Sequence, residues 1–181
     1  MKPKICFLFI GVIGLLLTGS CTEVVYKHHS DFDYSRYPTA FLYAVTHSDS
    51  YFYSDDQETL HNYFLNKLNQ KSSFTAIYND SAHHSSTDCK IELIIKSIIK
   101  TEQINEEGDR KIEMSAEMEV IVTDNKGVMI VRKNVHEENN RTLDKFSSSD
   151  EINTTIYDLS YEAVEDCLNT LSSLFLKDLE I

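Results

Sequence analysis

The most regular pattern in the chain is an alternation of apolar and polar residues over positions 112–122. Every second residue is apolar, and the residues between them are mostly acidic or small, with Ile121 as the exception. Successive side chains of a β-strand point to opposite faces of a sheet, so the pattern predicts a long strand with one buried and one solvated face. Turn-forming sequences at 105–109 and 124–127 flank it, which predicts a three-stranded meander ending at His136.

Residues 90–103, the first strand of this meander, fit two patterns, because their isoleucines would also line one face of a helix. The density of β-branched side chains favours the strand, since these side chains fit a pleated surface. The alternating set, with Ser97 in phase, is Ile91, Leu93, Ile95 and Ile99. Two shorter apolar runs, at 40–45 and 74–78, predict two further strands.

Apolar residues at helical spacing predict two helices. Leu60, Phe64 and Leu68 predict a helix over 55–69. Ser148 and Glu151 have the spacing of a capping box, and an apolar stripe follows them, which predicts a long helix over 150–179. The stripe consists of Ile152, Ile156, Leu159, Ala163, Cys167, Leu171 and Leu174.

The order of these elements is β-α-β-β-β-β-α, with a polar loop over 137–149 before the last helix. A mostly antiparallel sheet with one apolar face and a long amphipathic C-terminal helix can bury both apolar surfaces against each other. We therefore expect an α+β two-layer sandwich formed by a single domain over 39–181. About 160 residues can bury a sufficient core without disulfide bonds or metals.

The first 20 residues have the organisation of a secretory signal. Lys2 and Lys4 precede an uncharged run over 5–17, and small residues follow it. The run is too short to cross a bilayer, which takes about 20 apolar residues. We expect residues 1–20 to be removed rather than retained as a membrane span.

The run Leu17-Thr18-Gly19-Ser20-Cys21 resembles the lipobox of bacterial lipoproteins. The resemblance implies that the Cys21 thiol carries diacylglycerol, that the mature chain is palmitoylated, and that Cys21 becomes its N-terminus. Stable anchoring takes two or more acyl chains. Residues 21–38 are then a lipidated tether, and Thr22 in place of aspartate implies the outer membrane. The alternative is an ordinary signal peptide with an incidental cysteine.

Charge and glycine content exclude two classes of ligand. The formal net charge of −12 becomes −14 once Lys2 and Lys4 leave with the signal, and such a surface repels nucleic acid. Outside the signal the only glycines are Gly108 and Gly127, both in predicted turns. Phosphate-binding loops need clustered glycines, so we expect no nucleotide and no other cofactor.

Cys89 and Cys167 are the two cysteines beyond the signal and the lipobox. An exported chain permits a disulfide bond between them. Spacing alone does not establish one, and Cys167 lies on the apolar stripe of the last helix, where a buried free thiol is common. Both interpretations stay open at this point.

Candidate catalytic and metal-binding residues have simpler explanations. The pairs His28-His29 and His83-His84 lack the spacing of a zinc site, and we expect solvated loop histidines with no metal. No GxSxG motif occurs, and we expect no enzyme. A periplasmic hydrolase with Ser, His and Asp from separate loops is the remaining enzymatic alternative.

Two surface features are candidates for contact with a partner. Glu113, Glu117 and Glu119 share one face of the central strand, where they either pair with lysines of neighbouring strands, such as Lys96, or form a charged docking face. Tyr51, Phe52 and Tyr53 lie in a predicted loop, where they either bind a partner or cover the edge of the sheet.

Two segments of the chain resemble segments of small bacterial envelope lipoproteins. They are the run that leads into the first strand, Asp31-Phe32-Asp33-Tyr34-Ser35-Arg36-Tyr37-Pro38-Thr39-Ala40, and the hairpin at 122–130. This broad group includes lipopolysaccharide-assembly lipoproteins, activators of penicillin-binding proteins and uncharacterised lipoproteins. The resemblance implies a non-catalytic accessory or assembly protein, held in the bilayer by Cys21 and facing the periplasm, that contacts another envelope protein. A surface-exposed lipoprotein that binds host or environmental ligands is the alternative.

Overall fold

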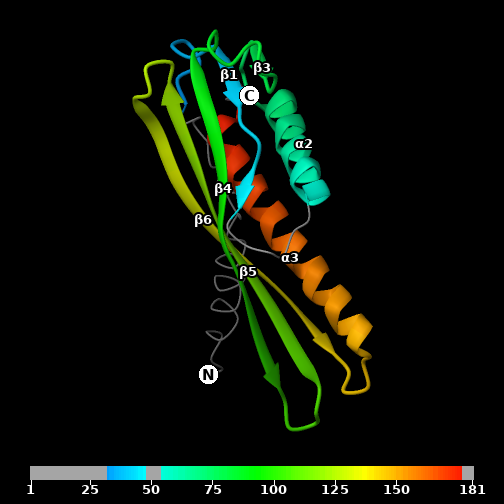
Figure 1. Cartoon of the computed structure of the whole chain (residues 1–181). Coiled ribbons are helices and arrows are strands. Elements are labelled where there is room, and N and C mark those ends of the chain that lie inside the picture. Colours follow the sequence, from blue (N-terminus) through cyan, green and yellow to red (C-terminus); the bar gives the residue numbers. More distant parts are fainter. Residues whose placement is uncertain (1–31, 48–53, 177–181) are drawn as a thin grey trace, which may run out of the picture.

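The computed structural model describes residues 32–47 and 54–176, except the side chains of Ser54 and Asp55. It is an α+β sandwich in which α2 and α3 lie on one side of a six-stranded sheet (Figure 1). The predicted element order is confirmed, with one extra strand of two residues. The elements are β1 (Thr39–Leu42), β2 (Thr46–His47), α2 (Ser54–Lys71), β3 (Ala76–Tyr78), β4 (Cys89–Ile104), β5 (Arg110–Asp124), β6 (Met129–Leu143), α3 (Ser149–Ser172) and a 3-10 turn η1 (Ser173–Phe175).

The sheet has a small parallel part and a large antiparallel part. The strand order is β3-β1-β4-β5-β6, and β2 pairs with β4 beside β1. β1 is parallel to both β3 and β4, so the chain needs a crossover, which α2 provides between β1 and β3. β4, β5 and β6 form the predicted meander.

A β-bulge between Ile95 and Ser97 changes which residues of β4 are buried. Before the bulge, the side chains of Ile91, Leu93 and Ile95 are fully buried, as predicted. After it Ile98 is 4% exposed, whereas Ile99 is 56% exposed. The prediction that Ile99 shares a face with Ile91, Leu93 and Ile95 was wrong, because the extra residue of a bulge moves the following side chains to the other face.

β6 continues to Leu143, so the predicted end of the strand at His136 and the predicted loop over 137–149 were wrong. The second half of β6 is polar but still pairs regularly with β5. Its residues on the helix side bond to α3 instead of joining the core: Asn139 donates to Asp166 at 2.9 Å, and Thr170 donates to Glu137 at 2.8 Å. Hydrophobic periodicity does not detect a strand whose covered face is polar.

α3 begins where the sequence predicted and has the predicted apolar stripe. The hydroxyl of Ser148 accepts a hydrogen bond from the backbone N–H of Glu151 at 3.2 Å, which caps the helix. Leu159, Ala163, Cys167 and Leu171 are buried against β5 and β6. The α-helix ends at Ser172, seven residues before the predicted end, and continues as the turn η1.

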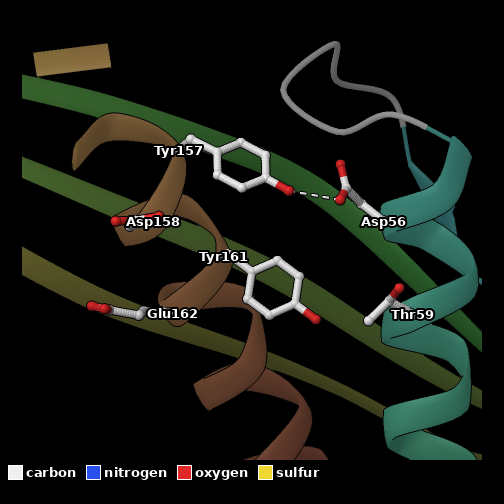
Figure 2. A pocket seen from close by; sticks show the side chains of 6 residues that line it. All are labelled: Asp56, Thr59, Tyr157, Asp158, Tyr161 and Glu162. Carbon is white, nitrogen blue, oxygen red and sulfur yellow. Dashed lines mark hydrogen bonds between the residues drawn. The ribbon is translucent and has the colours of Figure 1, made fainter. Parts of the chain in front are cut away.

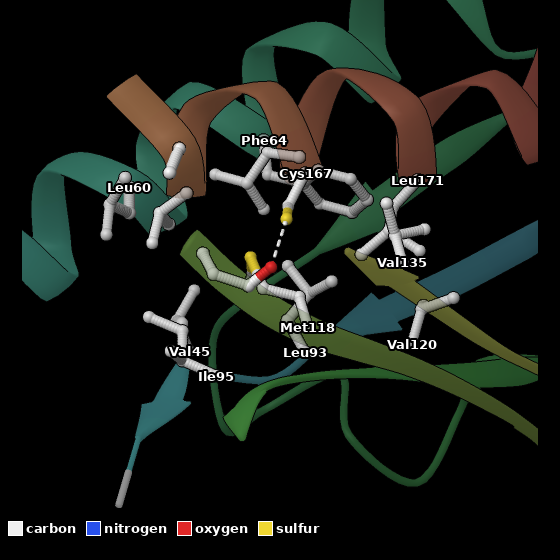
Figure 3. Close-up of a cluster of buried hydrophobic side chains, with 14 of the residues drawn as sticks. Val45, Leu60, Phe64, Leu93, Ile95, Met118, Val120, Val135, Cys167 and Leu171 are labelled. Atoms are coloured by element: carbon white, nitrogen blue, oxygen red, sulfur yellow. Dashed lines mark hydrogen bonds between the residues drawn. The ribbon is translucent and has the colours of Figure 1, made fainter. Parts of the chain in front are cut away.

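The core is one continuous cluster between the sheet and the two helices (Figure 3). Leu60, Phe64 and Leu68 of α2 and the even-numbered residues of β5 from Ile112 to Val122 are at most 1% exposed. Within the described residues no helix is long and apolar enough to cross a membrane.

The end of the predicted tether is part of the folded domain. Phe32 is 4% exposed and packs against Tyr34, Phe74 and Phe175 at ring-centroid distances of 5.1–5.4 Å. The Tyr34 hydroxyl donates to the backbone carbonyl of Phe175. Residues 32–38 therefore do not act as tether, because their aromatic rings fill the gap between the C-terminal end of α3 and the start of β1.

Candidate functional site

Several predicted site residues lie outside the described part of the chain. These are the signal over 1–20, the lipidation candidate Cys21, the first part of the tether over 22–31, and the aromatic triplet Tyr51, Phe52 and Tyr53. Their roles stay predictions.

Cys89 and Cys167 are separate free thiols, which corrects the disulfide alternative. Cys89, at the start of β4, is 3.6 Å from the carbonyl oxygen of Thr39, and Cys167 on α3 is 3.5 Å from that of Ala116 (Figure 3). Burial raises the pKa of each thiol to about 12. Both therefore stay protonated at neutral pH, as expected for structural rather than nucleophilic cysteines.

The histidines of the loop after β3 make local contacts and are only partly solvated. His84 Nε2 is 2.6 Å from the Tyr43 hydroxyl, and its ring packs against Phe41. The His83 ring stacks on Tyr78, with 4.2 Å between centroids, and its Nδ1 is 2.8 Å from Asp80. In the described ranges no group of three or more His, Cys, Asp or Glu residues could hold a metal ion.

The face of the sheet that points away from α2 and α3, here called the outer face, carries paired charges. Lys96 on β4 contacts Glu117 on β5 at 3.0 Å, as cross-strand pairing predicted. Glu119 bonds instead to Arg132 on β6, and this bond lowers the pKa of the Glu119 carboxyl. Glu119 is only 3% exposed, so its charge is compensated next to apolar surface rather than in bulk water.

A groove of about 410 Å³ lies between the N-terminal halves of the two helices (Figure 2). Tyr157 and Tyr161 of α3 point across it toward Asp56 and Thr59 of α2. The Tyr157 hydroxyl donates a hydrogen bond of 2.6 Å to Asp56, and this bond raises the pKa of Tyr157 to about 12. The groove is shallow. The two residues that form this bond across it are 101 positions apart in the sequence.

The two other acidic residues of the groove point away from α2. Figure 2 shows Asp158 and Glu162 directed to the opposite side of α3. There Arg141 of β6 lies 3.2 Å from Glu162 and 3.9 Å from Asp158. The carboxylate that faces α2 across the groove is therefore that of Asp56, which is bonded to Tyr157.

α2 buries a histidine against the segment after β1. Burial lowers the pKa of His61, whereas a backbone contact with Tyr43, in the segment after β1, acts in the opposite direction. One turn earlier, the side-chain amide of Gln57 contacts His47 of β2. The contact of Gln57 with His47 joins α2 to β2.

No protein-family model matches this chain, and no curated protein matches it. Solved structures do resemble it. A Helicobacter pylori protein described as a homologue of a neuraminyllactose-binding hemagglutinin has a TM-score of 0.55 at 8% identity, over 82% of this chain and 88% of that one. At that identity the similarity shows the fold alone.

Bacterial lipoproteins are among the other structural neighbours. A minor lipoprotein from Acinetobacter baumannii has a TM-score of 0.47 at 13% identity, with 77% of this chain and 90% of that chain covered. Rare lipoprotein B from Shewanella oneidensis has a TM-score of 0.43 at 12% identity, with 73% and 94% covered.

Sequence reasoning missed the groove and the length of β6. The tyrosines of the groove lie beside the apolar stripe of α3, but nothing in the sequence places them opposite Asp56. β5 and β6 are each 15 residues long in the structure, longer than the strands that hydrophobic alternation predicted.

Proposed function

We propose that this chain is a lipid-anchored protein of the bacterial envelope that acts by contact with another protein and catalyses no reaction. The observation that carries the proposal is the run Leu17-Thr18-Gly19-Ser20-Cys21 after two lysines and a short uncharged segment. Cys21 carries the acyl chains, and Thr22 directs the mature protein to the outer membrane, where it faces the periplasm.

The position of Phe32 limits how far the domain can stand from the bilayer. Phe32, which is packed in the core, is eleven positions after Cys21 in the sequence. A fully extended chain spans at most about 3.6 Å per residue, so the domain stays within about 40 Å of the membrane surface. A partner must come within that distance.

The chemistry of the described residues supports a role by contact. Both thiols have a pKa of about 12. No serine hydroxyl or cysteine thiol in residues 32–47 and 54–176 bonds to a histidine ring, which is the contact that activates a nucleophile. The surface offers paired charges and a shallow groove, which suit recognition of another protein.

The test is metabolic labelling of producing cells with a palmitate analogue. We expect the chain to incorporate label and the Cys21→Ala variant to incorporate none, with Cys89→Ala as the matched control that labels normally. An unlabelled wild-type chain would overturn the anchor. Protease added to intact cells should leave the protein whole, and cleavage would show that it faces outward.

A further inference from the structure

β6 is the last strand of the sheet, and its outer edge is unpaired within the described residues (Figure 1). It is 15 residues long, about three times the usual length of a strand. Such an edge presents a row of free backbone N–H and C=O groups that can pair with another strand. Charged residues normally prevent this, because most registers bring like charges together.

The charges of β6 are arranged so that one register brings unlike charges together. Two cations, Arg132 and Lys133, precede Val135, and two anions, Glu137 and Glu138, follow it at the same distances. If a second copy of β6 pairs antiparallel with its centre at Val135, Lys133 lies opposite Glu137 of the second copy and Arg132 opposite Glu138. Each contact occurs twice because the arrangement is symmetric.

Because successive side chains of β6 point to opposite faces of the sheet, the two residues of each contact lie on the same face. Lys133 and Glu137 have the same parity as the buried Val135 and therefore lie on the side of α3, whereas Arg132 and Glu138 lie on the outer face. The pairing of β6 with β5 is regular from Val131 to Leu143, and the irregularity near Met129 lies beyond the stretch 131–139 that the symmetric register needs.

The charge on the helix side is not compensated within the chain. Lys133 has no ion-pair partner among the described residues, and Glu137 accepts a hydrogen bond from Thr170 but contacts no cation there. The whole chain has a net charge of −12, yet the stretch 131–139 has two charges of each sign. The stretch that meets the second copy in this register is therefore neutral overall.

We propose that two copies of this chain form a symmetric dimer through antiparallel pairing of β6 with β6, centred on Val135. The two sheets then continue as one sheet across the interface. Backbone hydrogen bonds supply the attraction, and the contacts of Lys133 with Glu137 and of Arg132 with Glu138 select the register. This inference does not depend on acylation of Cys21.

A zero-length carbodiimide cross-link tests the register on the unmodified protein, in membranes and after purification of the full chain. This reagent joins a lysine to a carboxylate in contact with it. Lys133 and Glu137 of one chain are four residues apart on a strand, about 13 Å, which is too far for the reagent. A Lys133–Glu137 cross-link in a species of twice the monomer mass is expected. Its absence, or a cross-link from Lys133 to another protein, would overturn the proposal.

Charge reversal tests the same contact without a cross-linking reagent. The readout is co-purification of two differently tagged full-length copies. Lys133→Glu and Glu137→Lys each place two like-charged pairs in the interface, and we expect each to weaken association about tenfold. The double variant restores unlike pairs and should recover wild-type association. Lys145→Glu and Glu106→Lys, exposed charges outside β6, are the controls and should change nothing. Unchanged association in both single variants, or no recovery in the double variant, would refute the dimer.

Discussion

At the scale of single residues, burial decides which groups titrate and which stay inert. The thiols of Cys89 and Cys167 lie in the core and have raised pKa values, while His61 has a lowered one. The direction is opposite for the two residue types because burial disfavours the charged form, which is the thiolate for cysteine and the imidazolium for histidine.

The state of His61 predicts how stability depends on pH. Its pKa in the folded protein is below the usual 6.5, so the unfolded chain takes up a proton first as the pH falls. The stabilising contribution is fully present above pH 6.5 and is lost below it. We expect His61→Gln to reduce the fall in the free energy of unfolding between pH 7.5 and pH 5.5, measured by urea denaturation.

The control for this experiment is Asn62→Gln, an exposed position of the same helix that carries no titratable group. That variant should keep the slope of the wild-type protein. Equal slopes for the wild-type protein and His61→Gln would mean that His61 is protonated equally easily in the folded and unfolded chain.

The two core cysteines predict a specific pattern of alkylation. In the native protein at pH 8 we expect iodoacetamide to leave Cys89 and Cys167 unmodified, since both are buried and have a pKa of about 12. In urea without reductant, peptide mapping should find both modified. If neither is modified under those conditions, the two form a disulfide bond after all.

At the scale of elements, the sequence was sufficient where one physical effect dominates. The alternation of β5 and the stripe of α3 predicted their buried faces correctly, because hydrophobic burial alone determines both. Sequence patterns did not predict the bulge before Ser97, where a local backbone change moves Ile98 into the core. They also did not predict the second half of β6, where polar contacts with α3 replace apolar ones. The groove beside Tyr157 could not be predicted, because it depends on how two helices distant in sequence lie together.

Residues 32–38 also show how little a local sequence pattern can predict about packing. Phe32 has no periodic neighbours, so its sequence resembles a linker, yet it packs against Phe74 before β3 and Phe175 in η1. We expect Phe32→Ala to lower the free energy of unfolding by about 3–5 kcal/mol, as for other buried phenylalanines. Chemical denaturation measures this loss. Arg36→Ala, at an exposed position of the same segment, should change it by less than about 0.5 kcal/mol.

A small effect of Phe32→Ala would place the start of the domain at β1 and restore the longer tether. The reach of the domain from the membrane would then increase, since seven more residues would be free to extend. The measurement therefore bears on the anchored arrangement as well as on stability.

At the scale of the whole molecule, acidity is the dominant property. The net charge of −12 is spread over one small domain, and like charges repel each other in the compact state. The ion pairs of the described residues lie mostly at the surface, where each contributes little. Repulsion across the whole surface should therefore outweigh the attraction of individual pairs.

This balance predicts that salt stabilises the protein. Raising sodium chloride from 0.01 M to 0.15 M shortens the screening length from about 30 Å to about 8 Å, which weakens repulsion across the domain more than it weakens contacts at 3 Å. We expect the melting temperature to rise by several degrees, since 1 kcal/mol corresponds to about 2–4 °C at this size. Replacing Glu106 and Glu107 by lysine raises the net charge by four units at an exposed turn and should reduce the salt dependence. A melting temperature that falls with salt would show that the ion pairs, and not the net charge, control stability.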